Sequence, residues 1–238
     1  MKTLFKLTMK SASRDPFLLF WSILLPVGGM IGLGILIKSP EYPSQILTGM
    51  MATSILFYSL VTTAYAVLSQ RRRGVYNLLR VTPMPLWKYV WCIASAWTLI
   101  SFICGTIVLV VGVLMFNITI SAITILMIIP VTLVATIGYV LLSFFVASLS
   151  KNEGHVSIIS NICILPLMLC SNAFYSLDKA PTVLQTLSKF NPFQWFISGL
   201  RSCLTLDLSS CVTNVALLLI VVAVAMFLAV RTFRYTDV

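Results

Sequence analysis

The sequence predicts an all-α integral membrane protein with six transmembrane helices, an N-terminal interfacial helix and two short outer helices before the last span. Hydrophobic residues make up 59% of the 238 residues and charged residues only 9%, whereas soluble domains carry about 25% charged residues. Charge-free runs recur along the chain, each long enough to supply the roughly 20 apolar residues that a bilayer requires. Basic residues lie mainly in the short segments between these runs.

The first 16 residues predict a helix that lies on the membrane surface. Basic residues recur at every fourth position and share one helical stripe: Lys2, Lys6, Lys10 and Arg14. Apolar residues occupy the other side: Leu4, Phe5, Met9 and Ala12. Such a helix places its basic face against lipid headgroups. The alternative is a basic, frayed tail.

The whole chain, residues 1–238, is expected to form one transmembrane domain. The expected spans are residues 17–37, 46–69, 89–116, 121–149, 156–174 and 212–230. Between the second and third spans lies the most basic segment, residues 70–88. Residues 175–211 are too polar and too broken to span, and we expect two short re-entrant helices there on the outer side.

The second of these short helices has a clear start signal. Asn191 followed by Pro192 is a favoured pairing of N-cap and first helical residue, and apolar residues then follow at helical spacing as far as Leu204. The first short helix is expected between Pro181 and Phe190.

The distribution of positive charge predicts that both termini are cytoplasmic. With the N-terminus inside, the inner segments hold 12 of the 16 lysines and arginines, and the outer segments hold four. This is the bias of the positive-inside rule. The same rule explains the net charge of +10, so nucleic-acid binding is not needed to explain it. The sequence also leaves no basic or aromatic groove that could bind a nucleic-acid strand.

The residues that catalysis would require are missing from the expected spans. Every acidic residue lies in a loop or at a span boundary, and no phosphate-binding loop or metal-ligand spacing occurs. We therefore expect no catalytic site, no metal and no directly bound cofactor. The six cysteines are expected to be apolar packing residues, and a disulfide between Cys203 and Cys211 is left open.

The basic segment predicts a docking surface for a soluble partner. Three arginines precede Gly74, and apolar residues then follow at the i, i+3 and i+4 spacing of a short amphipathic helix: Val75, Leu78 and Leu79. This helix should stop at Thr82, because Pro83 disfavours helix at the residue before it. The alternative is an ordinary positive-inside loop.

Two motifs resemble those of the permease subunits of type-2 ABC exporters. They are RRRGVYNLLRVTP, from Arg71 to Pro83, and NPFQWFISGLR, from Asn191 to Arg201. The resemblance extends over nearly the whole chain and rests on the order and spacing of the motifs. It implies that two permease chains pair, either two copies or this chain and a sister permease. The permease pair would lie in the lipid bilayer. Two separate cytoplasmic ATPase subunits, which hold the ATP and Mg²⁺, would bind to its cytoplasmic side.

The resemblance also implies two functional regions. The residues that couple to the ATPase would be Arg71, Arg72, Arg73, Gly74, Val75, Leu78, Leu79, Thr82 and Pro83. The outer-gate helix would carry Asn191, Pro192, Gly199, Leu200 and Arg201. The family often has acidic residues around the coupling glycine, where this chain has arginine, tyrosine and asparagine. We therefore expect an ATPase partner with an acidic receiving groove.

The function implied is export of a hydrophobic or amphipathic solute, such as a drug, an antimicrobial peptide or a lipid-like compound. A permease that exports polysaccharide or teichoic acid is the alternative within this class. A non-transporting sensor or scaffold subunit is an alternative from another class. A membrane enzyme acting on lipids is disfavoured by the missing catalytic groups.

Overall fold

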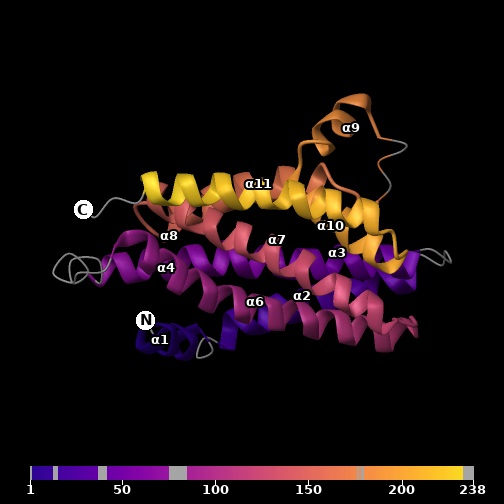
Figure 1. Ribbon diagram of the computed structural model, residues 1–238, viewed down its shortest axis with the longest axis horizontal. Helices are drawn as coiled ribbons and strands as arrows, with labels where there is room; N and C mark the ends of the chain where they lie inside the picture. The colour runs from indigo at the N-terminus through magenta and orange to yellow at the C-terminus, as the bar shows by residue number, and fades with distance from the viewer. Residues whose placement is uncertain are drawn as a thin grey trace.

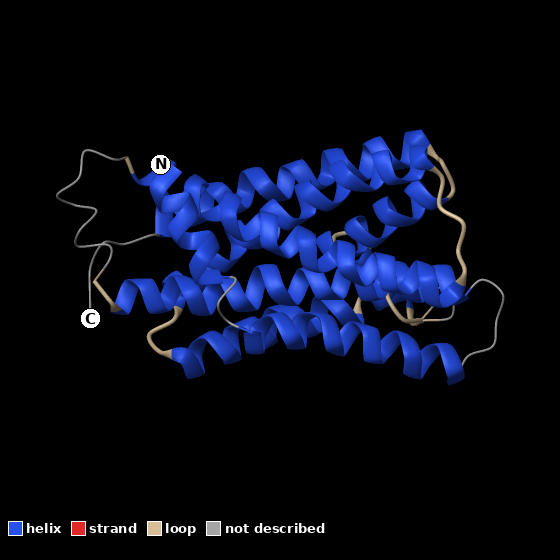
Figure 2. Ribbon diagram, turned by 90° about the horizontal axis from the view of Figure 1, so that it is seen from below, coloured by secondary structure: helices blue, strands red, loops and turns tan. Residues whose placement is uncertain are grey.

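The computed structural model is a bundle of helices that lie side by side along one direction. It describes residues 2–12, 16–36, 42–74, 85–175, 177 and 180–232, and none of these residues is in a strand. Figures 1 and 2 show the long helices running along the longest axis of the molecule. In Figure 1, α9 (Thr182–Ser188) stands off from the bundle at one end. The C-terminal ends of α11 and α4 are both at the opposite end of the molecule (Figure 1).

Long apolar helices form the bundle. Their bounds are α2 (Pro16–Leu36), α3 (Tyr42–Leu56), η1 (Phe57–Thr62), α4 (Thr63–Arg72), α6 (Leu86–Phe116), α7 (Ala122–Leu149), α8 (Glu153–Leu169) and α11 (Leu208–Thr232). Two shorter helices flank them: α1 (Lys2–Ala12), which packs on α6, and α10 (Pro192–Leu204), which packs on α7 and α11.

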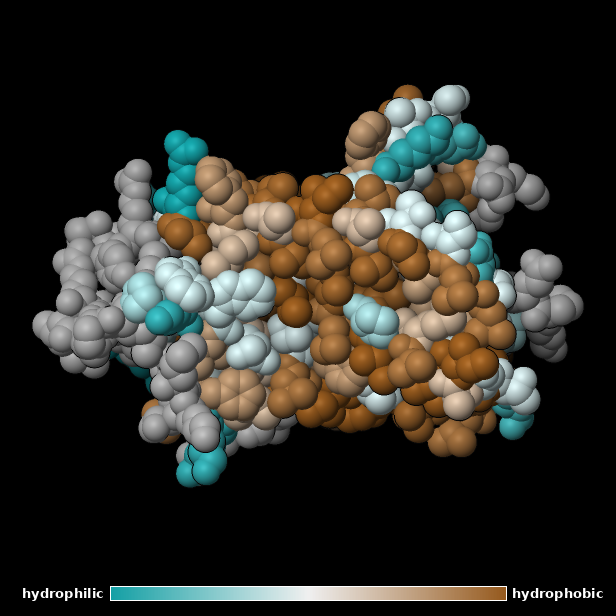
Figure 3. Space-filling model, viewed as in Figure 1, coloured by the Kyte–Doolittle hydropathy of each residue, from teal (hydrophilic) through white to brown (hydrophobic). Residues whose placement is uncertain are grey.

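Four of the described helices are long and apolar enough to cross a membrane: Tyr42–Arg72, Trp87–Phe116, Ala122–Leu149 and Leu208–Thr232. Two shorter apolar helices accompany them, Ser22–Ile35 and Glu153–Leu169. Figure 3 shows hydrophobic residues across the middle of the molecule, with hydrophilic residues gathered toward its ends. Trp87 and Trp91 are exposed in the first turns of α6, and tryptophan near the end of a span anchors it at a membrane interface.

The second apolar run forms the most buried of the long helices. α3, η1 and α4 follow one another without a break and cover 31 residues, about 46 Å at 1.5 Å per residue. The middle segment, Phe57–Thr62, is π-helical, a departure that often marks a functional position. The sequence did not predict it.

Close helix approach inside the bundle depends on small residues. A Cβ built on Gly112 would lie 2.3 Å from Leu47 Cδ1, and one built on Gly105 would lie 2.5 Å from Ile55 Cδ1. The Ser54 hydroxyl donates to the Ser22 carbonyl over 2.7 Å and so joins α3 to α2. Membrane helices pack in this way because lipid gives no hydrophobic drive for helix association.

The largest difference from the expected boundaries concerns the fifth span. We expected it to run over residues 156–174, but α8 ends at Leu169 and Cys170 is its C-cap. The physical reason is that Asn191 Nδ2 donates hydrogen bonds to the carbonyls of Leu167 and Cys170. These carbonyls are satisfied without a further helical turn, and the chain leaves the helix after Leu169. The first short helix is also shorter than expected, Thr182–Ser188 rather than 181–190.

Candidate functional site

The first candidate region, here called the arginine end, consists of Arg71–Gly74 and residues 150–153. Gly74 has φ +71°, a left-handed conformation that glycine adopts without steric cost. Its N–H donates to the Arg71 carbonyl over 3.0 Å, and the Arg73 N–H donates to the Ser69 carbonyl over 3.1 Å. Gly74 therefore ends α4 as a C-terminal capping glycine.

Two of the arginines turn toward the segment that joins α7 to α8. Arg71 Nη1 lies 3.5 Å from the Ser150 carbonyl oxygen, and Arg72 Nη2 lies 3.5 Å from that of Lys151. Arg72 also forms an ion pair with Glu153 at 3.6 Å. This segment is itself ordered, because Asn152 caps α8 by accepting from the His155 N–H over 2.8 Å.

Apolar packing beneath the arginine end links the same three helices. Ala64 and Leu68 of α4, Val146 of α7 and Val156 of α8 form a buried cluster. The Tyr89 hydroxyl donates to Gln70 Oε1 over 3.1 Å and ties α6 to α4. A displacement of the end of α4 would therefore be passed on to α6, α7 and α8.

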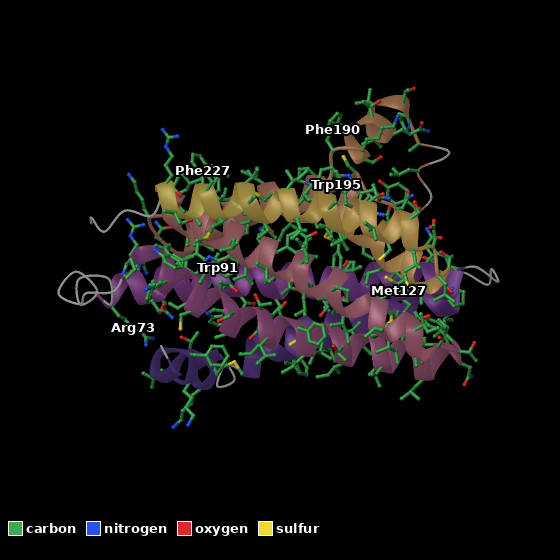
Figure 4. The ribbon with its side chains drawn as sticks, in the orientation of Figure 1. Arg73, Trp91, Met127, Phe190, Trp195 and Phe227 are labelled. Carbon is green, nitrogen blue, oxygen red and sulfur yellow. The ribbon has the colours of Figure 1, made fainter. Side chains whose placement is uncertain are left out.

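The structure places the predicted coupling residues only in part. Arg71 to Gly74 lie together at the arginine end, where Figure 4 shows Arg73 at the end of the molecule. The rest of the predicted set lies outside the described residues: Val75, Leu78, Leu79, Thr82 and Pro83. The contacts of Arg71 and Arg72 with their own chain were not predicted.

The second candidate region, here called the cap end, consists of α9, α10 and the residues that hold them. Asn191 has only 5% of its surface exposed. Its Oδ1 accepts from the Phe193 N–H over 2.9 Å, which caps α10. Its Nδ2 donates to the carbonyls of Leu167 and Cys170, each over 2.8 Å. One side chain thus satisfies the start of α10 and the end of α8.

The rest of α10 is seated against α7 and α11. The Pro192 carbonyl accepts from the Tyr139 hydroxyl over 3.3 Å. A Cβ on Gly199 would lie 2.9 Å from Val131 Cγ1 and 3.4 Å from Asn214 Cβ. Leu200 is buried.

Arg201 points from α10 toward α3 and the segment after α8. Its guanidinium donates to Thr48 Oγ1 through Nε and to the Asn172 carbonyl through Nη2. Asn172 is held in turn by Gln194, whose Oε1 accepts the Asn172 N–H over 2.7 Å. The predicted outer-gate residues therefore lie at the start of α10 or within it, and their contacts join it to α3, α7, α8 and α11.

Sequence reasoning missed the residues outside the predicted set that hold the cap end, which are Thr48, Gly49, Asn172 and Gln194. Gly49 of α3 approaches the backbone so closely that a Cβ would lie 2.1 Å from the Ala173 carbonyl oxygen. The only sign of this contact in the sequence is a glycine inside an apolar run, and its partner is more than a hundred residues away.

Within the described residues, no group of three or more His, Cys, Asp and Glu side chains could hold a metal ion.

Comparison with known protein families decides what this bundle is. A family model described as ABC-2 type transporter matches residues 1–205. The chain belongs to this family. A comparison with curated proteins found no match. The match spans both the arginine end and the cap end as far as Thr205, and it identifies the chain as a membrane component of a transporter, here called the permease.

The arginine end of the permease gives a first prediction. We expect Arg72→Glu to weaken transport several-fold because the new carboxylate repels Glu153, and we expect Glu153→Arg in the same chain to restore much of it. The pair is exposed, with 49% and 72% of the two side chains accessible, so the coupling energy should be only about 0–1 kcal/mol. Transport assays on the four members of this double-mutant cycle measure the coupling, and strictly additive losses would contradict it.

Proposed function

We propose that the permease is the membrane subunit of an ATP-driven exporter that moves a hydrophobic or amphipathic solute out of the cell. In this proposal the chain spans the membrane six times, with both termini and the arginine end in the cytoplasm. It pairs with a second permease chain and binds separate ABC ATPase subunits that hold ATP and Mg²⁺. The solute class comprises drugs, antimicrobial peptides and lipid-like compounds.

One observation carries the proposal beyond family membership. The end of α4 lies in the predicted docking segment, residues 70–88, and is linked to residues 150–153 by Arg71 and Arg72. An ATPase that pushed on the docking segment would therefore act on α4 and, through its contacts, on α6, α7 and α8. Such a linkage suits a subunit that passes movement of an ATPase to its membrane helices.

The direct test is reconstitution of the permease with its ATPase in liposomes. We expect the two proteins to co-purify, and we expect candidate amphipathic solutes to stimulate ATP hydrolysis and to be moved in an ATP-dependent way. Stimulation by polysaccharide precursors alone would indicate the alternative exporter class. A stable complex whose ATPase activity responds to no solute and moves none would indicate a non-transporting subunit.

The conformation of Gly74 gives a second prediction. We expect Gly74→Pro to abolish transport while insertion is retained, because proline fixes φ near −65° and lacks the N–H that donates to the Arg71 carbonyl. Gly74→Asn is the matched control, since asparagine tolerates the left-handed region, and it should keep most of the activity. Transport in vesicles with equal amounts of inserted permease measures both. Equal activity of the two variants would contradict the proposed role of Gly74.

A further inference from the structure

Two of the permease's six cysteines face each other at the cap end. Cys203 lies in the last turn of α10, and Cys211 lies in the first turn of α11. Their sulfur atoms are 3.7 Å apart. Cys203 is fully buried and Cys211 is 6% exposed, so no solvent separates them.

The turn between the two helices fixes this placement. Leu206 has φ +57°, a left-handed conformation that is uncommon for a non-glycine residue. The Asp207 N–H donates to the Ser202 carbonyl over 2.9 Å, and the Asp207 side chain accepts from the Ser210 N–H over 3.2 Å. Hydrogen bonds from Ser210 lower the pKa of the Asp207 carboxyl, so this cap persists in mildly acidic conditions.

We propose that Cys203 and Cys211 form a disulfide bond in the mature permease. The two thiols lose two electrons and two protons, and the disulfide of an external thiol-oxidising partner is reduced to a dithiol. One thiolate attacks the partner's disulfide and forms a mixed disulfide. The second thiolate then attacks the permease sulfur of that mixed disulfide and releases the reduced partner. The sulfur atoms are 3.7 Å apart and must approach by about 1.7 Å to reach the S–S bond length of about 2.05 Å.

The location of the pair follows from the proposed function, because the cap end is then outside the cell. Disulfides form and persist on that side, whereas cytosolic thiols are kept reduced. Burial raises the pKa of the Cys203 thiol, which leaves little thiolate once α10 is packed. We therefore place the oxidation during membrane insertion, before the hairpin of α10 and α11 closes.

The bond would fasten the end of α10 to the start of α11. Asn191 already holds the beginning of α10 to the end of α8. With both ends held, α10 cannot swing open alone and must move together with α11. The cap end would then act as one rigid unit in the transport cycle.

The experiment counts free thiols in intact membranes. Cells are quenched in acid, the protein is denatured, and a polyethylene-glycol maleimide adds a mass to each thiol with or without prior reduction. Of the six cysteines, we expect four to react without reductant and all six after reduction. Modification of all six without reductant would overturn the proposal.

Two single variants identify the pair. In Cys203→Ser, all five remaining thiols should react without reductant, because Cys211 has lost its partner. In the matched control Cys163→Ser, only three should react without reductant. If only three thiols of Cys203→Ser react without reductant, the disulfide joins two other cysteines and the proposal is overturned.

The failure of this inference can be told from failure of the proposed function. Lys189→Cys at the exposed end of α9 reports the side of the membrane through a maleimide that cannot cross the bilayer. If Lys189→Cys is labelled from outside and all native thiols are free, the disulfide is refuted while the proposed orientation and transport stand. If labelling requires permeabilised cells, the orientation itself is wrong.

Discussion

Asn191→Leu is expected to prevent the permease from accumulating as a folded protein. Leucine is close to asparagine in size but removes an acceptor for the Phe193 N–H and donors for the carbonyls of Leu167 and Cys170. Each buried backbone group left without a partner costs about 1–3 kcal/mol, so the total is on the order of 3 kcal/mol or more. This is a large share of the roughly 5–15 kcal/mol that holds a typical domain together.

A graded series separates the two roles of this side chain. Asn191→Ser keeps an N-cap oxygen for α10 but cannot reach both carbonyls of α8, so its loss should be intermediate. Asn191→Asp keeps the cap but sets a carboxylate against two carbonyl oxygens, and we expect it to be nearly as harmful as leucine. Ser121→Ala is the control, because it removes one exposed N-cap bond to Ile123, worth about 1 kcal/mol.

The measurement is thermal unfolding of detergent-purified permease, followed by the loss of the monodisperse peak in size-exclusion chromatography. The expected order of stability is wild type, Ser121→Ala, Asn191→Ser, and then the aspartate and leucine variants together. If Asn191→Asp were as stable as wild type, the amide would not be holding the end of α8, and its role would be confined to capping α10.

The helices themselves could be predicted because the bilayer imposes a simple requirement. A span must satisfy its backbone hydrogen bonds internally and present apolar side chains over about 30 Å. A long apolar run in the sequence is the result. Local start and stop signals were equally readable, as at Asn191 and Pro192, where α10 begins. Asn117 adopts the left-handed conformation directly after α6, in the short gap between the expected spans 89–116 and 121–149.

The neighbours of each helix could not be predicted, because lipid-facing and protein-facing residues are both apolar. Nothing in the pattern around Pro166 shows that α8 must end at Leu169, since the cause is a side chain 22 residues beyond that point. The same holds for Arg72, whose partner Glu153 is distant in sequence. Local helix propensity carries no information about such contacts. The acidic groove expected on the ATPase partner stays a prediction.

Gly49→Val is the second substitution with a large expected effect. Gly49 lies in the middle of α3, and a Cβ there would meet the Ala173 carbonyl oxygen at 2.1 Å and the Ala173 carbonyl carbon at 2.9 Å. Both are backbone atoms, so rotation of a side chain cannot relieve the clash. Either α3 must retreat or the segment after α8 must move.

Either movement would disturb the hydrogen bonds that hold the cap end. Thr48, beside Gly49, accepts from Arg201, and Asn172, beside Ala173, accepts from the same guanidinium. Separating the two segments would leave the half-buried charge of Arg201 with fewer acceptors, which is costly in a membrane protein. We therefore expect even Gly49→Ala to lower the unfolding temperature clearly, and Gly49→Val to leave little folded permease.

Gly28→Ala provides the matched control, because it also adds a Cβ to a glycine in an apolar helix but meets nothing within 4 Å. Alanine is a better helix former than glycine by about 1 kcal/mol, so this variant should be as stable as wild type or slightly more stable. The readout is again thermal unfolding in detergent, together with the amount of permease recovered from membranes. If Gly49→Ala behaved like Gly28→Ala, α3 and Ala173 would not be in contact, and the cap end would be held by α8 and α10 alone.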